Sequence, residues 1–127
     1  MVDASDNFAT RYAINRVCHH YGKPLVSGAV IRMEGQVGVF MPGAEMPCYA
    51  CLYPEDTTLD ESCVNSGVLG PAAGIIGSVQ ALETIKVLLG IGRPLCARLL
   101  LFDGAAMEWR ELSIPKRNNC PVCSSHE

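Results

Sequence analysis

Residues 8–21 show the spacing of an amphipathic helix. The apolar residues that recur three or four positions apart are Ile14, Val17, Cys18 and Tyr21. Asp6 or Asn7 offers a side-chain acceptor for the free N–H groups of a first turn, and Gly22 is a typical helix end. The pattern predicts a helix over 8–21. Because it follows an acidic turn so near the start, it indicates a strand–helix unit whose strand lies before Met1.

Shorter alternation in two other regions predicts four β-strands, the first two of which form a hairpin. Residues 24–33 (PLVSGAVIRM) predict a strand, Glu34-Gly35 a turn, and residues 36–41 (QVGVFM) the returning strand. Residues 97–104 and 107–114 predict two further strands. With the helices on either side, this order is typical of an α/β protein.

The most apolar stretch, GVLGPAAGIIGSVQALETIKVLLGIG, predicts a long helix over residues 70–89 with Pro71 in its first turn. Each charge at the centre of a bilayer costs about 2.5–3.5 kcal/mol. Because Glu83 and Lys86 lie within the stretch, we interpret it as a buried helix of a water-soluble domain. Close approach of a neighbouring element is expected at its small residues, which are Gly70, Gly74, Gly77 and Ser78.

Composition narrows the possible classes of protein. The chain has 127 residues, 49% of them hydrophobic and 18% charged, which suits one globular domain or part of a larger one. A net charge of −3 without a basic stripe argues against nucleic acid or an anionic membrane as the main partner. The N-terminus lacks the pattern of a signal peptide. Seven cysteines without that pattern indicate a reducing, cytoplasmic setting, in which metal or catalytic roles are favoured over disulfides.

Two Cys-x-x-Cys pairs, CYAC and CPVC, stand far apart in the sequence. Four thiolates from two such pairs form a closed tetrahedral zinc site, which would join the exit of the first hairpin to the C-terminal tail. The alternatives are a redox disulfide in each pair, or unligated thiols. His19, His20 and His126 are spare ligand candidates that we expect to face solvent, and we expect Cys18 and Cys96 to be buried or half-buried. The predicted zinc ligands are Cys48, Cys51, Cys120 and Cys123.

Residues 52–66 form a polar segment without periodicity, which predicts a long loop and so a candidate functional region. Cys63 within it is a candidate nucleophile, although neighbouring acids would raise its pKa, and an ordinary loop cysteine is the alternative. Asp3 and Asp6 precede the first helix. Carboxylates at the carboxyl end of a strand in an open α/β sheet suit Mg²⁺ held with nucleotide phosphates, whereas simple helix capping is the alternative.

Five segments together resemble the ThiF/MoeB/HesA family, the bacterial relatives of ubiquitin-activating enzymes. They are DASDNFATRYAINRVCHHYGKPLVSGAVIRMEGQVGVF, CYACLYPE, GVLGPAAGIIGSVQALETIKVLLG, LFDG and CPVC, in the family's order. The resemblance covers residues 3–123. It implies a Rossmann-like fold whose mixed sheet carries helices and a four-cysteine zinc knuckle.

The resemblance also implies an activity. Members of the family bind ATP and Mg²⁺ and adenylate the C-terminal glycine of a ubiquitin-like sulfur-carrier protein, for sulfur transfer in thiamine or molybdopterin biosynthesis. By this resemblance Asp6 is the catalytic Mg-ATP carboxylate, Asn7 its neighbour in the nucleotide site, and Cys63 a residue that links covalently to the carrier. The four paired cysteines match the structural zinc ligands.

One departure from the family's pattern is large. No G-x-G-x-x-G turn opens a helix after a strand, although the family carries such a nucleotide turn ahead of this region. We therefore expect residues 1–127 to be the C-terminal part of the domain, without its N-terminal nucleotide-binding half, and inactive alone. A homodimer or companion chain is expected to cover the apolar helix. A non-catalytic, zinc-stapled module that binds a ubiquitin-like partner is the alternative function.

Overall fold

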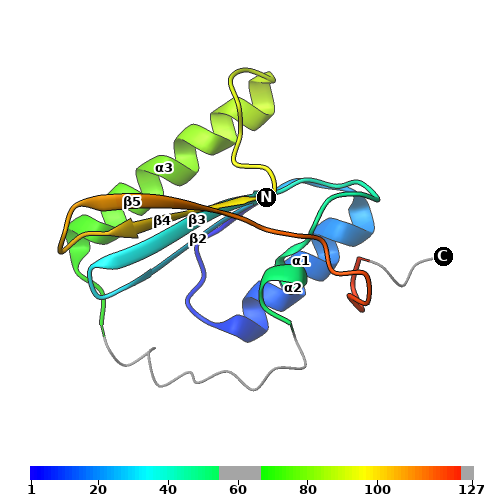
Figure 1. The fold of residues 1–127 in the computed structure, drawn as a ribbon, viewed down its shortest axis with the longest axis horizontal. Helices are drawn as coiled ribbons and strands as arrows, with labels where there is room; N and C mark the ends of the chain where they lie inside the picture. The colour runs from blue at the N-terminus through cyan, green and yellow to red at the C-terminus, as the bar shows by residue number, and fades with distance from the viewer. Residues whose placement is uncertain (55–66, 124–127) are drawn as a thin grey trace.

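The computed structural model describes residues 1–54 and 67–123, which form a five-stranded mixed sheet with helices on both faces (Figure 1). The strand order is β1-β2-β3-β4-β5, with β1 parallel to β2 and the other neighbours antiparallel. The predicted α/β class is confirmed. Along the chain the elements are β1 (Val2–Asp3), α1 (Phe8–Tyr21), β2 (Leu25–Ile31), β3 (Glu34–Phe40), α2 (Tyr49–Leu52), α3 (Gly70–Leu89), β4 (Arg98–Asp103) and β5 (Glu108–Ser113).

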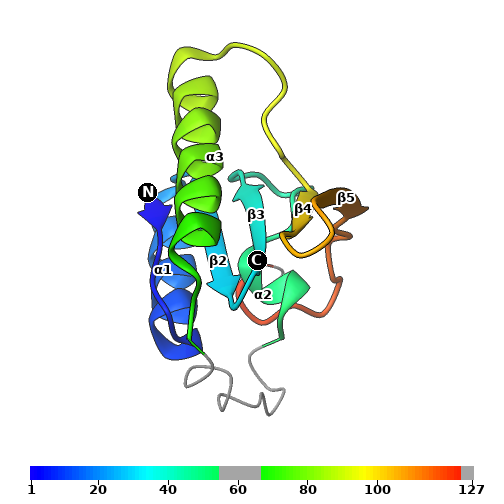
Figure 2. The ribbon, with the colours of Figure 1, turned by 90° about the vertical axis from the view of Figure 1, so that its left-hand side faces the viewer.

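The sheet separates two hydrophobic cores. In Figure 1, α1 and α2 lie below the sheet and α3 above it, while Figure 2 shows β1 and β5 at opposite sheet edges. The core on the α1 side contains Cys18, Leu25, Phe40, Tyr49, Leu99 and Ile114. The core on the α3 side contains Val26, Val37, Val39, Ile76, Leu95 and Phe102. Successive strand residues point to opposite faces, so apolar runs such as LV in β2 supply both cores.

The first helix has the predicted bounds. Asn7 is its N-cap, and its side chain accepts a hydrogen bond from Thr10 N at 2.8 Å. Gly22 ends the helix in the left-handed conformation with φ 65°. The strand of the predicted strand–helix unit does not lie wholly before Met1, because Val2 and Asp3 already pair with β2. The turn between β1 and α1 is therefore set within the described chain.

The first hairpin turns two residues earlier than predicted. Ile31 pairs with Glu34, so Arg32 and Met33 form the turn and Glu34-Gly35 belong to β3. Arg32 adopts a positive φ of 57°, a conformation that is uncommon for residues other than glycine. Hydrogen bonds from Arg32 N to Gly67 O and from Leu69 N to Arg32 O hold this turn to the segment before α3. These tertiary contacts thus place the turn at Arg32 and Met33, although the local sequence Glu34-Gly35 favours a turn.

The predicted bounds of α3 are confirmed, but its predicted burial is wrong. Its buried residues are Ala72, Ile76, Gln80 and Glu83. Leu88 is 77% exposed and Leu89 66% exposed, so one face packs on the sheet and the other faces outward. By length and composition alone, α3 is long and apolar enough to cross a membrane, and 22% of its most apolar stretch is buried. One such helix is weak evidence for a membrane span.

Close approach between α3 and the sheet comes from strand glycines and not from the predicted small residues of the helix. A Cβ built on Gly74 or Gly77 meets no atom within 4 Å. A Cβ on Gly28 would lie 2.2 Å from Gln80 Cδ, and one on Gly35 would lie 2.4 Å from Ile76 Cγ1. The side chains of α3 therefore occupy the space that the two strand glycines leave.

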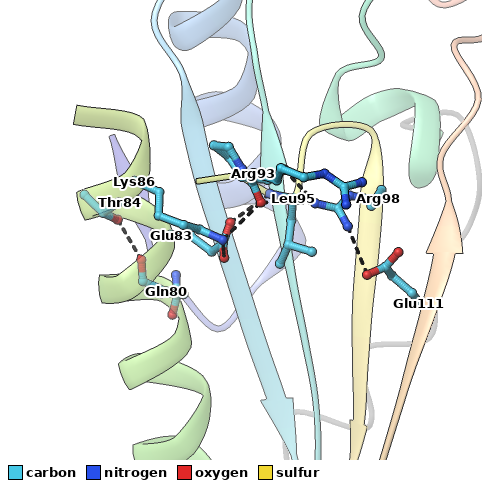
Figure 3. A network of polar contacts seen from close by, with 9 residues as sticks. Gln80, Glu83, Thr84, Lys86, Arg93, Leu95, Arg98 and Glu111 are labelled. Carbon is cyan, nitrogen blue, oxygen red and sulfur yellow. Dashed lines mark hydrogen bonds and ion pairs between the residues drawn. The ribbon is translucent and has the colours of Figure 1, made fainter. Parts of the chain in front are cut away.

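The buried charge of Glu83 is fully engaged at the C-terminal end of α3 (Figure 3). Its carboxylate accepts a hydrogen bond from Leu95 N at 2.7 Å and pairs with Lys86 Nζ at 2.6 Å. Lys86 also donates to Arg93 O at 3.1 Å. These contacts hold the chain after α3 against the helix and lead it into β4, where Arg98 pairs with Glu111.

Candidate nucleotide cavity and metal centre

The acidic turn between β1 and α1 is ordered by several side chains. Asp3 is buried, and its Oδ1 accepts a hydrogen bond from Ser5 N at 2.8 Å. Arg11 Nη2 donates to Ser5 O at 2.9 Å, and Asn7 caps α1. Among the described hydrogen bonds, Asn7 provides the helix cap and Asp3 holds the turn through Ser5 N, so capping of α1 by Asp3 or Asp6 is not what the structure shows. Asp6 differs because its side chain is exposed, with Oδ1 accepting a 3.3 Å hydrogen bond from Asn7 Nδ2.

Gln80 fastens this turn to α3, a role that sequence reasoning missed. Its Nε2 donates to Asp3 O at 2.9 Å and approaches Val26 O at 3.4 Å, so one buried amide spans the two parallel strands. Because β1 has only two residues, its pairing with β2 is weak by itself. The two hydrogen bonds of Gln80, here called the Gln80 clip, help to hold β1 in place. The feature of the sequence that could have predicted this role is the polar side chain of Gln80 in the middle of an apolar helix.

A cavity of about 510 Å³ opens beside the acidic turn, where the carboxyl ends of the parallel strands meet. This is the usual position for a ligand in an open α/β sheet. A second cavity of about 630 Å³ adjoins it and shares Phe8 and Arg11 with it. Residues around the first cavity include Asp6, Asn7, Arg11, Ala73, Gly77 and Gln80.

Arg11 and Tyr49 connect this region to the core. The Arg11 guanidinium lies 5.3 Å from the centre of the Phe8 ring, and its Nε is buried without a hydrogen-bond partner. Burial raises the pKa of Tyr49 to about 12, although the charge of Arg11 acts in the opposite direction. The Tyr49 hydroxyl therefore stays protonated at neutral pH.

The two predicted cysteine pairs converge. Cys48 Sγ lies 3.6 Å from Cys120 Sγ, and Cys51 Sγ lies 3.5 Å from Cys123 Sγ. All four sulfur atoms lie within 4.8 Å of one another, and all four residues are buried. Sulfurs around a tetrahedral zinc ion at about 2.3 Å stand about 3.8 Å apart. A disulfide needs about 2.05 Å. The arrangement fits one metal ion and is too wide for disulfides.

Donors from α1 and from the segment after β5 contact the sulfur cluster. Asn15 of α1 donates from Nδ2 to Cys48 Sγ at 3.5 Å and accepts from Tyr49 N at 3.0 Å. Arg117 N lies 3.4 Å from Cys51 Sγ. The hydrogen bond between the Cys48 and Cys51 side chains lowers the pKa of Cys51 and raises that of Cys48, whereas Asn15 lowers the pKa of Cys48 and Arg117 N lowers that of Cys51. Such donors favour the thiolate form, which is the form that binds zinc.

The other cysteines and the histidines lie apart from the sulfur cluster or outside the described residues. Cys18 is buried and Cys96 half-buried, as predicted. His19 and His20 lie in the last turn of α1 and are not part of the sulfur cluster. Cys63 and His126 lie outside the described residues. The nucleotide candidates and the metal candidates therefore occupy two different places, joined by α1 with Asn7 at its start and Asn15 beside Cys48.

Comparisons with known proteins agree with this fold. The model of the ThiF family matches residues 1–122. The chain is 47% identical to "Adenylyltransferase and sulfurtransferase MOCS3" of Drosophila willistoni, covering 98% of this chain and 28% of the relative. It is 45% identical to "Sulfur carrier protein adenylyltransferase" of Thermus thermophilus, covering 97% of this chain and 48% of the relative. The chain thus spans less than half the length of these relatives.

Solved structures show the same fold at low sequence identity. The crystal structure of E. coli MccB with ATP superposes with a TM-score of 0.78 at 16% identity, over 98% of this chain and 39% of that one. MccB with MccA-N7isoASN gives 0.77 at 14% identity, over 98% and 40%. These likenesses support the fold alone. Since the family model covers nearly the whole described chain, the chain belongs to the ThiF family.

Proposed function

We propose that this chain forms part of an adenylyltransferase that activates the C-terminal glycine of a ubiquitin-like sulfur-carrier protein. Family membership and the name of the Thermus relative support the reaction class. The observation that carries the proposal for this chain is the cavity of about 510 Å³ with Asp6 and Asn7 in its wall. The product would serve sulfur transfer in thiamine or molybdopterin biosynthesis, and the identity of the carrier decides between them.

In the proposed reaction a carboxylate oxygen of the carrier's last glycine attacks the α-phosphorus of ATP. A new P–O bond forms while the bond to the β-phosphate oxygen breaks, and pyrophosphate leaves. Bound Mg²⁺ would offset charge on the phosphates. Asp6 suits the metal because its carboxylate is exposed on a turn that Asp3, Arg11 and Gln80 hold in place.

The sulfur cluster has a separate proposed role. We assign Cys48, Cys51, Cys120 and Cys123 to one structural zinc ion, because four thiolates leave no open coordination position for a substrate. The ion would tie the segment after β3 to the C-terminal end of the described chain. Thiolate ligands suit a reducing compartment such as the cytoplasm. Cys63 remains a proposed covalent attachment point for the carrier.

We propose that residues 1–127 are the carboxyl-terminal part of the family's domain and that the Gly-rich nucleotide turn comes from another segment. The test is ATP–pyrophosphate exchange with a glycine-ending carrier, using the chain alone and the chain mixed with a polypeptide that carries that turn. We expect background exchange from the chain alone and carrier-dependent exchange from the mixture. Full exchange by the chain alone would contradict its proposed incompleteness.

Asp6→Asn tests the assigned carboxylate in the exchanging mixture. We expect a loss of about 100-fold or more, because the metal loses a charged ligand. Asp103→Asn is the matched control, since Asp103 is also an exposed aspartate in a turn, at the end of β4. Equal exchange by the Asp6 and Asp103 variants would remove Asp6 from the proposed site.

A second candidate is a non-catalytic, zinc-stapled interaction or dimerisation module. The outward face of α3 favours it, because this face exposes Leu82, Ile85, Leu88 and Leu89. Sedimentation equilibrium of the wild type and Leu88→Glu tests this candidate. We expect the wild type to self-associate and the variant to sediment as a monomer, since a charge in an apolar interface opposes association. A monomeric wild type would contradict self-association.

A further inference from the structure

The proposed zinc centre carries a net charge that the protein must balance. Four thiolates and one Zn²⁺ sum to −2, and the four cysteines are 1–7% exposed. An uncompensated charge in such a place is costly, and hydrogen-bond donors around metal ligands normally offset it. The hydrogen-bond donors beside the cluster are therefore needed to balance the charge of the proposed centre.

Lys116 supplies a full positive charge at this position. Its Nζ lies 3.1 Å from Cys123 Sγ, whereas the contacts from Asn15 Nδ2 and Arg117 N come from neutral groups at 3.5 and 3.4 Å. Hydrogen bonds from charged donors are about twice as strong as neutral ones. Cys123 is thus the ligand whose sulfur is most strongly shielded by a cation among the described contacts.

The ammonium group is also held in place. Besides Cys123 Sγ, Lys116 Nζ donates to Cys123 O and to Met46 O, both at 3.3 Å. A lysine ammonium has three donors, and these three acceptors match them in number. Met46 precedes the first cysteine pair and Cys123 completes the second. Lys116 therefore connects both metal-binding segments and keeps its charge beside the cluster.

We propose that Lys116 is the charge-compensating residue of the zinc centre, slowing zinc loss and protecting the Cys123 sulfur from electrophiles. The inference rests on the zinc assignment above and not on the adenylation reaction. A structural thiolate that reacted with an electrophilic group would no longer hold the metal. Lys116 lowers the electron density that Cys123 offers to such groups while leaving the sulfur bound to the metal.

Lys116→Met removes the charge and the donors at similar side-chain length, and Lys116→Arg keeps the charge. Lys23→Met is the matched control, because Lys23 is exposed and lies well before the four candidate ligands in the sequence. Zinc release from each zinc-loaded protein into excess colorimetric chelator gives the rate. We expect release from Lys116→Met to be about 10-fold faster or more, as for other groups that support metal ligands. Lys116→Arg is expected to stay within about threefold of wild type.

Labelling with N-ethylmaleimide, mapped by mass spectrometry, separates charge compensation from simple loosening. We expect faster labelling of Cys123 in Lys116→Met, ahead of the other three ligands. Equal labelling gains at all four sulfurs would overturn the proposal, as would release from Lys116→Arg as fast as from Lys116→Met. Equal release by the Lys116→Met and Lys23→Met variants would also overturn it. A wild type purified without stoichiometric zinc would instead overturn the zinc assignment itself.

Discussion

The acidic turn and the sulfur cluster are built in opposite ways. In the cluster four buried side chains converge, and the described chain supplies all four sulfurs of the proposed zinc site. In the turn the buried residues serve the backbone, while Asp6, the residue assigned to chemistry, is exposed beside an open cavity. The regions proposed for stability and for chemistry are therefore separate. The proposed metal site needs no group from outside the described chain, whereas Asp6 faces a cavity in which a ligand is proposed to bind.

The largest effect is expected from breaking the cluster. Cys120→Ser removes one thiolate from a site whose metal binding is coupled to folding, so we expect zinc content below about a tenth of wild type. The melting temperature should fall by about 10 °C or more. Elemental analysis and thermal circular dichroism measure the two quantities. Cys96→Ser is the control, because Cys96 is half-buried and not part of the cluster; an equal effect there would show that the loss is not specific to the metal ligands.

The next effect tests how rigidly the acidic turn is held. Gly28→Ala places a Cβ 2.2 Å from Gln80 Cδ, so Gln80 must move and its bonds to Asp3 O and Val26 O break. Overpacking and lost buried hydrogen bonds together cost about 3 kcal/mol. Urea unfolding measures the loss, and hydrogen exchange at Ser5 N reports the turn.

Gly77→Ala is the control for Gly28→Ala, because a Cβ at Gly77 meets no atom within 4 Å and α3 gains a better helix former. Zinc content should be unchanged in both variants. If Gly28→Ala left exchange at Ser5 N unaltered, the clip from Gln80 would not be what orders the turn.

A smaller effect on stability is expected at Tyr49, which lies between the two regions. This effect appears only in alkaline solution. Burial raises its pKa from 10.0 to about 12, so the folded state keeps the proton that the unfolded state loses. The contribution of protonated Tyr49 to the free energy of unfolding is therefore fully present below pH 10, and about 2 kcal/mol of it is lost as the pH approaches 12. Tyr49→Phe should remove much of this fall in urea unfolding at pH 8 and pH 11. Tyr21→Phe, at an exposed position, should retain it; the opposite pattern would contradict the assignment.

The smallest effect on stability is expected at the residue assigned to chemistry. Asp6→Asn changes an exposed side chain that is not the helix cap, so the free energy of unfolding should move by less than about 0.5 kcal/mol. Urea unfolding at pH 7 provides the measurement. A loss of about 2 kcal/mol would mean that Asp6 holds the turn together, and the contrast between the two regions would be lost.

Local patterns were enough for several features. Asn7 and Gly22 have the chemistry of helix caps, and they cap α1. Pro71 begins α3 as predicted. The two Cys-x-x-Cys pairs indicated four ligands, since metal geometry requires a fixed number of thiolates whatever the fold between them. The hairpin turn was misplaced because Arg32 is held by Gly67 and Leu69, which lie far away in the sequence.

Sequence patterns were enough to predict α1, α3, the class of fold and the candidate cysteines, because caps, periodicity and ligand type act over a few residues, but they did not predict β1 or α2. Three features could be seen only in the folded chain: Gln80 bonds to the turn that carries Asp6, Lys116 contacts Cys123, and α3 exposes an apolar face. These features depend on contacts between segments that lie far apart in the sequence. Such contacts form only when the chain folds, so local sequence patterns do not predict them.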